Sequence, residues 1–193
     1  MKHLKALRFL VLLAVPLLSG CPFSTKPKDD PPPPPIVYKP ATSPENLLEN
    51  LQTAYTNKNI FEYLAIFSGA FTFVFNPDDV EQNPGEIPVS WGIAEEQFAH
   101  EQLFDDSEVF AIALTWSPQD REVSEIPQAD TKIVINNIRL TVETLDDSGG
   151  ERTLLAEGDA WFYFIKTGAT TDEGDSLWAV WQWEDRTVVT GGL

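Results

Sequence analysis

Residues 43–73 read SPENLLENLQTAYTNKNIFEYLAIFSGAFTF, and this stretch decides the fold class because it places two helices directly before a strand. Ser43, followed by a proline, is typical of a helix N-cap with proline at the first helical position. Leucines and other apolar residues then recur at helical spacing, which predicts a helix over 44–56. Asn59 can cap a second, shorter helix, and the alternating residues 71–75 predict a strand.

The rest of the chain predicts one more helix and a series of strands. A proline-rich loop covers residues 77–89, and the run GIAEEQFAHEQLF that starts at Gly92 holds good helix formers without proline. Four longer strands are expected after this helix: 108–116, 131–145, 151–166 and 177–190. Helices followed by antiparallel strands predict an α+β fold, with N-terminal helices packed against a curved antiparallel sheet in a single domain over residues 43–193.

The N-terminus has the features of an export signal over residues 1–20. Basic residues precede an apolar run from 9 to 18, which is too short to span a bilayer because a spanning helix needs about 20 apolar residues. The sequence then reads Leu18-Ser19-Gly20-Cys21, and Cys21 is the only cysteine in the chain. This resembles the lipobox of bacterial lipoproteins, which implies cleavage before Cys21 and acyl chains on that residue as a stable membrane anchor.

The segment that follows Cys21 predicts a spacer between the membrane and the domain. Residues 21–42 include five consecutive prolines, and such a chain extends by about 3.1 Å per residue, so it could reach roughly 60 Å. A ligand for a proline-recognition domain is the alternative, with nothing further in the sequence to support it. Pro22 stands where the resemblance would place Asp in a protein retained at the inner membrane. We therefore expect the outer membrane, with the domain facing the periplasm.

The charge balance excludes some classes of partner. The chain has 13 basic and 30 acidic residues, and without Lys2, Lys5 and Arg8 its formal net charge of -17 falls by three to -20. Nucleic-acid binding needs clustered Lys and Arg, so we expect no nucleic-acid partner. No phosphate loop, dinucleotide fingerprint or hydrolase elbow is present, so we expect no cofactor.

Several short stretches together resemble the nuclear transport factor 2-like superfamily, in particular its small bacterial lipoprotein members. They are residues 43–73, Leu103-Phe104, 158–162 and 178–185. The resemblance implies a cone-shaped α+β domain whose open end can form a pocket, used by some members for isomerisation or cyclisation and by others for binding or assembly. It also implies that two copies can pair through their sheets. No catalytic motif of those enzymes matches this sequence, so no catalytic residue is carried over.

His100 is the first candidate catalytic residue. It lies one helical turn after Glu96, and a Glu-His pair at this spacing could orient the imidazole as a general base. The alternative, which we favour, is a solvated pair on the helix surface that adds a few tenths of a kcal/mol. His100-Glu101 lacks the second histidine of the HExxH zinc motif, and residues 172–175 lack the ligand alternation of a calcium loop. We expect no metal site.

Asp185 is the second candidate. It follows Trp181 and Trp183 on one parity of the last predicted strand, so all three side chains could face the inside of the cone. There Asp185 would be an acid among aromatic rings and a candidate base. We favour the alternative, in which this strand-end acid pairs with Arg186 or with solvent.

Aromatic residues are the other candidates for a pocket. The residues proposed to line it are Tyr63, Trp91, Trp116, Trp181 and Trp183, although tryptophans in strands more often fill the core. The favoured hypothesis is a non-catalytic domain that binds a small apolar ligand or an envelope protein. The alternative is a pocket enzyme of the isomerase or cyclase type with an Asp or His base.

Overall fold

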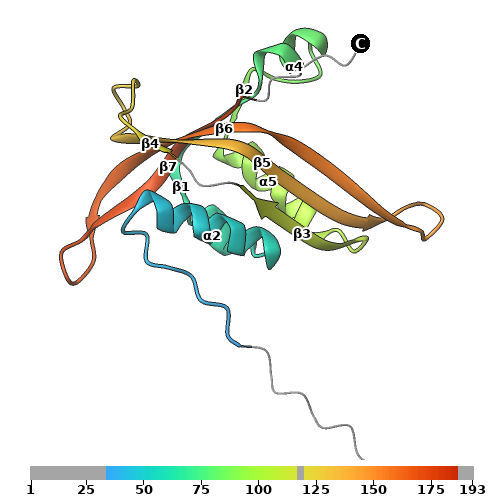
Figure 1. Ribbon diagram of the computed structural model, residues 1–193, viewed down its shortest axis with the longest axis horizontal. Helices are drawn as coiled ribbons and strands as arrows, with labels where there is room; N and C mark the ends of the chain where they lie inside the picture. The colour runs from blue at the N-terminus through green and yellow to red at the C-terminus, as the bar shows by residue number, and fades with distance from the viewer. Residues whose placement is uncertain (1–33, 117–119, 187–193) are drawn as a thin grey trace, which may run out of the picture. The chain divides into compact units, whose positions relative to one another are not determined.

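One curved sheet forms the framework of the domain in the computed structural model, which describes residues 34–116 and 120–186. The strand order is β2-β1-β7-β6-β5-β3, with β4 paired to β5, and Figure 1 shows the long, curved β5 and β6 strands. Neighbouring strands pair antiparallel except β1 and β7, which are parallel. The strands are β1 (Phe67–Val74), β2 (Ser90–Gly92), β3 (Val109–Thr115), β4 (Asp120–Glu122), β5 (Thr131–Leu145), β6 (Glu151–Thr170) and β7 (Ser176–Asp185).

The described helices are α2 (Pro44–Thr56), α3 (Ile60–Leu64), α4 (Pro77–Gln82) and α5 (Ile93–Asp105). Helix α2 begins as the sequence predicts, because the Ser43 hydroxyl accepts the Asn46 N–H at 3.1 Å. Helix α3 begins in the same way, with the Asn59 side chain accepting the Glu62 N–H at 3.2 Å. The two N-terminal helices predicted from the sequence are therefore confirmed, together with their caps.

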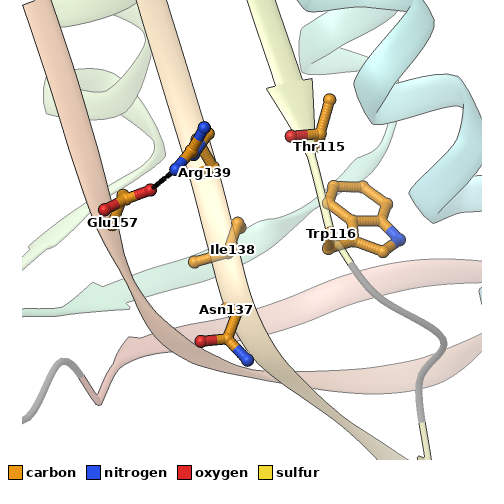
Figure 2. A pocket seen from close by; sticks show the side chains of 6 residues that line it. All are labelled: Thr115, Trp116, Asn137, Ile138, Arg139 and Glu157. Atoms are coloured by element: carbon orange, nitrogen blue, oxygen red, sulfur yellow. Dashed lines mark hydrogen bonds and ion pairs between the residues drawn. The ribbon is translucent and has the colours of Figure 1, made fainter.

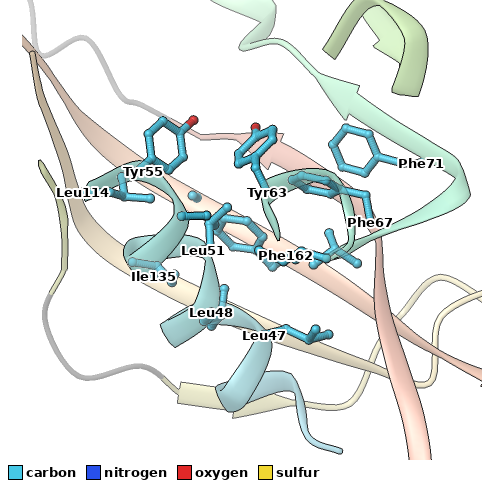
Figure 3. Close-up of a cluster of buried hydrophobic side chains, with 14 of the residues drawn as sticks. Leu47, Leu48, Leu51, Tyr55, Tyr63, Phe67, Phe71, Leu114, Ile135 and Phe162 are labelled. Carbon is cyan, nitrogen blue, oxygen red and sulfur yellow. The ribbon is translucent and has the colours of Figure 1, made fainter. Parts of the chain in front are cut away.

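The core lies between α2 and one face of the sheet, which we call the inner face. Figure 3 shows Leu47, Leu48 and Leu51 of α2 together with Phe162 of β6 in one cluster of buried side chains. Each is at most 1% exposed, and burying one such side chain stabilises the fold by about 1.5–3 kcal/mol. The α+β prediction, with N-terminal helices packed on a curved and mostly antiparallel sheet, is confirmed.

The prediction of a loop over residues 77–89 is wrong in part. It contains α4, which starts because the Asn76 side chain accepts the Asp78 N–H at 2.9 Å and proline occupies the first helical position. Ser90 and Trp91, which follow that loop, belong to β2, which pairs with β1. The short strand β4 was not predicted, because its sequence does not alternate between apolar and polar residues. Residues 187–190 of the last predicted strand lie outside the described residues.

The folded unit starts at Val37, before the expected domain start at residue 43. The Asn50 side chain accepts the Lys39 N–H at 2.7 Å and donates to the Lys39 carbonyl at 2.8 Å. The Trp178 N–H of β7 donates to the Ala41 carbonyl at 2.8 Å. The predicted signal, Cys21 and most of the proline-rich segment lie outside the described residues. Within the described part of the chain, no helix is long and apolar enough to cross a membrane.

Candidate functional site

The inner face of the sheet contains a small cavity of about 140 Å³, which we call the inner cavity. Its walls bring together α2, β1, β3, β5, β6 and β7, and the side chains that matter most below are Tyr55, Phe73, Ala156, Trp183 and Asp185. An engineered apolar cavity of about 150 Å³ is large enough to bind benzene. The inner cavity therefore suits a compact molecule or one end of a longer ligand.

Strand β7 turns Trp183 and Asp185 to the inner face. Trp183 pairs with Phe162 in the β6 ladder, and Asp185 pairs with Ala160 two residues further on. The Trp183 ring lies 4.7 Å from the Phe162 ring and 5.3 Å from the Phe73 ring, between centroids. Because residues two apart on a strand share a face, Asp185 lies on the same side as Trp183.

Arg186, which the sequence suggests as a partner of Asp185, also has an acidic neighbour in Glu184. The Arg186 guanidinium contacts the Glu184 carboxylate, with Nε 2.8 Å from Oε2. Glu184 is one residue away from Asp185 on the strand and so faces the opposite side of the sheet. Among the described residues, Asp185 lines the inner cavity and Arg186 does not.

Trp181 does not share the inner face with Trp183, contrary to the predicted parity. Tyr163 pairs with Gln182, whereas the next residue, Phe164, pairs with Val180. The register therefore shifts by one residue at Trp181, and a β-bulge of this kind breaks the period of two. Trp181 is not among the described residues that line the inner cavity.

Behind the Tyr55 wall of the inner cavity, the structure buries Glu96. Only 1% of Glu96 is exposed, and its two carboxylate oxygens accept from the Tyr63 hydroxyl and from Trp91 Nε1, the latter at 2.7 Å. Burying a carboxylate is costly unless hydrogen bonds replace its water shell. Helix α3, strand β2 and helix α5 each place one residue of this arrangement, so three separate elements meet at a single side chain.

His100 connects Glu96 to the wall of the inner cavity. Its Nδ1 lies 3.0 Å from the Glu96 carbonyl oxygen and 3.2 Å from Glu96 Oε1, and its Nε2 lies 2.6 Å from the Tyr55 hydroxyl. Both neighbours of Nδ1 are acceptors, so Nδ1 carries the proton. In the neutral ring Nε2 then accepts the proton of the Tyr55 hydroxyl. We call Tyr55, Tyr63, Trp91, Glu96 and His100 the Glu96 network.

Burial sets the protonation states in the Glu96 network. It lowers the pKa of His100 below the ordinary value of 6.5, and the nearby Glu96 only partly opposes this effect. Burial also raises the pKa of Tyr55 and of Tyr63 well above 10, and the negative charge of Glu96 adds to the increase for both. The imidazole is therefore neutral at pH 7, and both phenols keep the protons that they donate.

The solvated Glu96–His100 pair favoured from the sequence is wrong, because the side chain of His100 is 13% exposed and that of Glu96 is 1% exposed. The other predicted pocket residues are divided. Tyr63 and Trp91 hold Glu96, and Trp183 lines the inner cavity with Asp185. The sequence prediction missed Tyr55 and Phe73, which also line it. The position of Tyr55 on the apolar stripe of α2 was visible in the sequence, but its partner on a distant helix was not.

Trp116 lines a second, more open hollow of about 450 Å³ (Figure 2). This hollow lies where β5 bulges between Ile135 and Ile138 and where Asn137 adopts a positive φ of 58°. Its rim carries the ion pair between Arg139 and Glu157, which Figure 2 shows across β5 and β6. The described residues contain no group of three or more His, Cys, Asp or Glu that could hold a metal ion.

No protein-family model and no curated protein matches this chain. Among solved structures, similar ones include an NTF2-like (nuclear transport factor 2-like) protein of unknown function in nutrient uptake from Rhodospirillum rubrum, with 9% identity and a TM-score of 0.45, over 76% of this chain and 99% of that chain. A protein of unknown function with a cystatin-like fold from Nostoc punctiforme has 11% identity and a TM-score of 0.45, over 76% of this chain and 89% of that one. AusH from Aspergillus nidulans has 15% identity and a TM-score of 0.43, over 76% of this chain and 85% of that one. The elements, the sheet and the cavity described above define the class of protein: an α+β domain with a curved sheet and an inner cavity.

Proposed function

We propose that this chain is a lipid-anchored protein of the bacterial cell envelope whose domain binds a small molecule in the inner cavity without changing it chemically. The observation that carries the binding proposal is the inner cavity itself, whose walls include aromatic rings and the acidic side chain of Asp185. Ligand sites in proteins are typically concave and mostly apolar, with a few placed polar groups. The same features favour a small ligand over an envelope protein as the occupant.

The anchor rests on the sequence. Lys2, Lys5 and Arg8, the apolar run and the residues before Cys21 support export and lipidation, with the outer membrane facing the periplasm as the destination. The test is Cys21→Ser with metabolic labelling by palmitate and membrane fractionation. We expect the unaltered chain to carry label and to sediment with the outer membrane, and the variant to lose the label. Label that persists in Cys21→Ser would disprove lipidation at this residue.

Ligand binding can be tested by native mass spectrometry of the mature protein released from detergent micelles. We expect an additional mass that dissociates on denaturation. Ala156→Phe should abolish this mass, because Ala156 lines the inner cavity and pairs with Leu140 on the inner face. Leu155→Phe is the matched control, since Leu155 is 53% exposed and neighbouring strand residues face opposite sides. Equal retention of the mass in both variants would contradict binding in the inner cavity.

A pocket enzyme remains the second candidate function, and one observation favours it. Asp185 lines the inner cavity, and the Tyr55 wall is hydrogen bonded to the buried His100 and, through it, to Glu96. An acid beside a bound ligand can act as a general base when it reaches the proton to be removed. The test is to incubate the dissociated ligand with fresh protein and follow its mass and isomer composition. Conversion that Asp185→Asn abolishes would establish the enzyme, and an unchanged ligand would leave the non-catalytic proposal in place.

A further inference from the structure

We propose that the open hollow beside Trp116 is a second binding site and that its ligand is a neutral saccharide. We call this space the Trp116 hollow, and its described lining consists of Thr115, Trp116, Asn137, Ile138, Arg139 and Glu157 (Figure 2). Its volume of about 450 Å³ lies within the range of roughly 300–1,000 Å³ that is typical of ligand pockets. The inference does not depend on the function proposed for the inner cavity.

The Trp116 hollow lies where two strands separate. Thr115 is the last residue of β3 and pairs with Arg139 of β5, and the bulge of β5 comes just before that pair. Within the bulge, Asn137 has a positive φ of 58°, a left-handed conformation that glycine adopts more easily than asparagine. Bulges often redirect a side chain next to a functional site. Here the bulge places the Asn137 side chain at the hollow (Figure 2).

The lining contains hydrogen-bonding groups that the fold itself does not use. The Thr115 hydroxyl, the Asn137 side-chain amide and Trp116 Nε1 form no hydrogen bond with any other described residue. The amide and the hydroxyl can each donate and accept, and the indole N–H can donate. Thr115 and Asn137 are also exposed, so a ligand reaches both without a rearrangement of the chain.

The two charged side chains of the lining compensate each other. The Arg139 guanidinium contacts Glu157 through Nε and Nη2, and both nitrogens meet the same carboxylate oxygen, Oε1. Oε2 of Glu157 is left as an acceptor for a ligand hydroxyl. The other described lining residues are uncharged. A charged ligand would therefore find no unpaired opposite charge in this lining, and a neutral one is favoured.

A saccharide matches this combination of groups. Its hydroxyls both donate and accept, as the amide, the hydroxyl and the ion pair require. One face of its ring carries C–H groups, which pack on the negative face of an indole. Figure 2 shows the Trp116 ring on one side of the hollow and the pair of Arg139 and Glu157 on the other. A purely apolar ligand would displace water from these polar groups without replacing its hydrogen bonds.

The experiment is saturation-transfer NMR on the full chain in lipid nanodiscs. The neutral probes are maltose, cellobiose, lactose and N,N′-diacetylchitobiose, and the anionic probe is glucuronate. We expect transfer to at least one neutral probe, strongest at the C–H protons of one ring face, and none to glucuronate. Transfer to none of the neutral probes, or to glucuronate as strongly as to them, would overturn the inference.

Asn137→Gly is the most informative variant, because it removes the amide while glycine suits the positive φ at this position. We expect urea unfolding to show no loss of stability, whereas the dissociation constant of the bound disaccharide should rise at least about fivefold, since a donor and an acceptor are lost. Asn136→Ala is the matched control, because Asn136 is exposed and is not among the described lining residues. Equal affinity in the two variants would overturn the assignment of Asn137 and, with it, the site.

Ala156→Phe distinguishes the Trp116 hollow from the inner cavity, which shares Ile138 and Glu157 with it. Ala156 lines the inner cavity and is not among the described residues of the Trp116 hollow, so the disaccharide should bind Ala156→Phe as it binds the unaltered chain. Loss of binding in this variant would place the sugar in the inner cavity and overturn the second site. Sugar binding that persists, together with no retained mass in native mass spectrometry, would overturn the proposed function of the inner cavity and support the second site.

Discussion

The substitution Glu96→Gln tests whether the Glu96 network holds the helices on the sheet. In the folded chain the carboxylate accepts from Tyr63, from Trp91 at 2.7 Å and from His100 Nδ1 at 3.2 Å. All three neighbours are donors. Glutamine has the same shape but supplies one acceptor oxygen and an NH2 group, so at least one donor would face another donor.

The magnitude follows from two opposing effects. Removing the charge relieves the desolvation penalty of a buried carboxylate, which alone would favour the amide. Against this, hydrogen bonds to a charged group contribute about 1.5–3 kcal/mol each, and one unsatisfied buried donor costs about 1–3 kcal/mol. Because two bonds are weakened and a third becomes a clash of donors, we expect the loss to win. The free energy of unfolding should fall by about 3 kcal/mol.

The assay is urea unfolding at pH 7, followed by tryptophan fluorescence, with equal denaturant slopes required for the comparison. Glu101→Gln is the matched control on the same helix, since its amide oxygen can still accept from Gln97, as Glu101 does at 2.6 Å. The control should change the free energy of unfolding by less than about 0.5 kcal/mol. A change in Glu96→Gln that is as small as in the control would refute the structural role assigned to this network.

Three further substitutions test other hydrogen bonds and the burial of His100. Trp91→Phe removes one donor to Glu96 and should cost about 1.5–3 kcal/mol in urea unfolding, but less in a chain that already carries Glu96→Gln, since the two residues share one bond. Burial lowers the pKa of His100, so near and below pH 6.5 this residue binds more protons in the unfolded chain than in the folded chain. The free energy of unfolding should therefore fall as pH is lowered from 7.5 to 5.5, and it should fall less steeply in His100→Gln. Asn50→Ala removes both hydrogen bonds to the Lys39 backbone, so limited proteolysis should cut residues 37–42 faster than in the unaltered chain, with about 1–2 kcal/mol lost in unfolding.

The parts of the fold that could be predicted from sequence are those with local causes. Ser43 and Asn59 cap their helices within three residues, and the long strands β5 and β6 are visible from composition and alternation. Helix α4 was hidden because two prolines nearby are equally typical of a loop. The bulge at Trp181 was hidden because it depends on the register of a partner strand.

The site was less predictable because helix α5 reverses the usual relation between polarity and burial. Phe98 is 66% exposed, whereas Glu96, two residues earlier, is 1% exposed. A pattern based on polarity therefore assigns the wrong face to the core. The burial of Glu96 depends on donors from α3 and β2, which lie elsewhere in the sequence and meet α5 only in three dimensions.

Tyr55 joins the two parts of the site, and this has a consequence for how a ligand would be bound. Its ring belongs both to the wall of the inner cavity and to the buried cluster, where it lies 5.3 Å from the Tyr63 ring and 5.6 Å from the Phe104 ring. Its hydroxyl is held by His100. A wall fixed by packing and by a hydrogen bond loses little freedom when a ligand arrives, and preorganisation of this kind lowers the cost of binding. Loss of the Glu96 network should therefore weaken ligand binding through the Tyr55 wall, although neither Glu96 nor His100 lines the inner cavity.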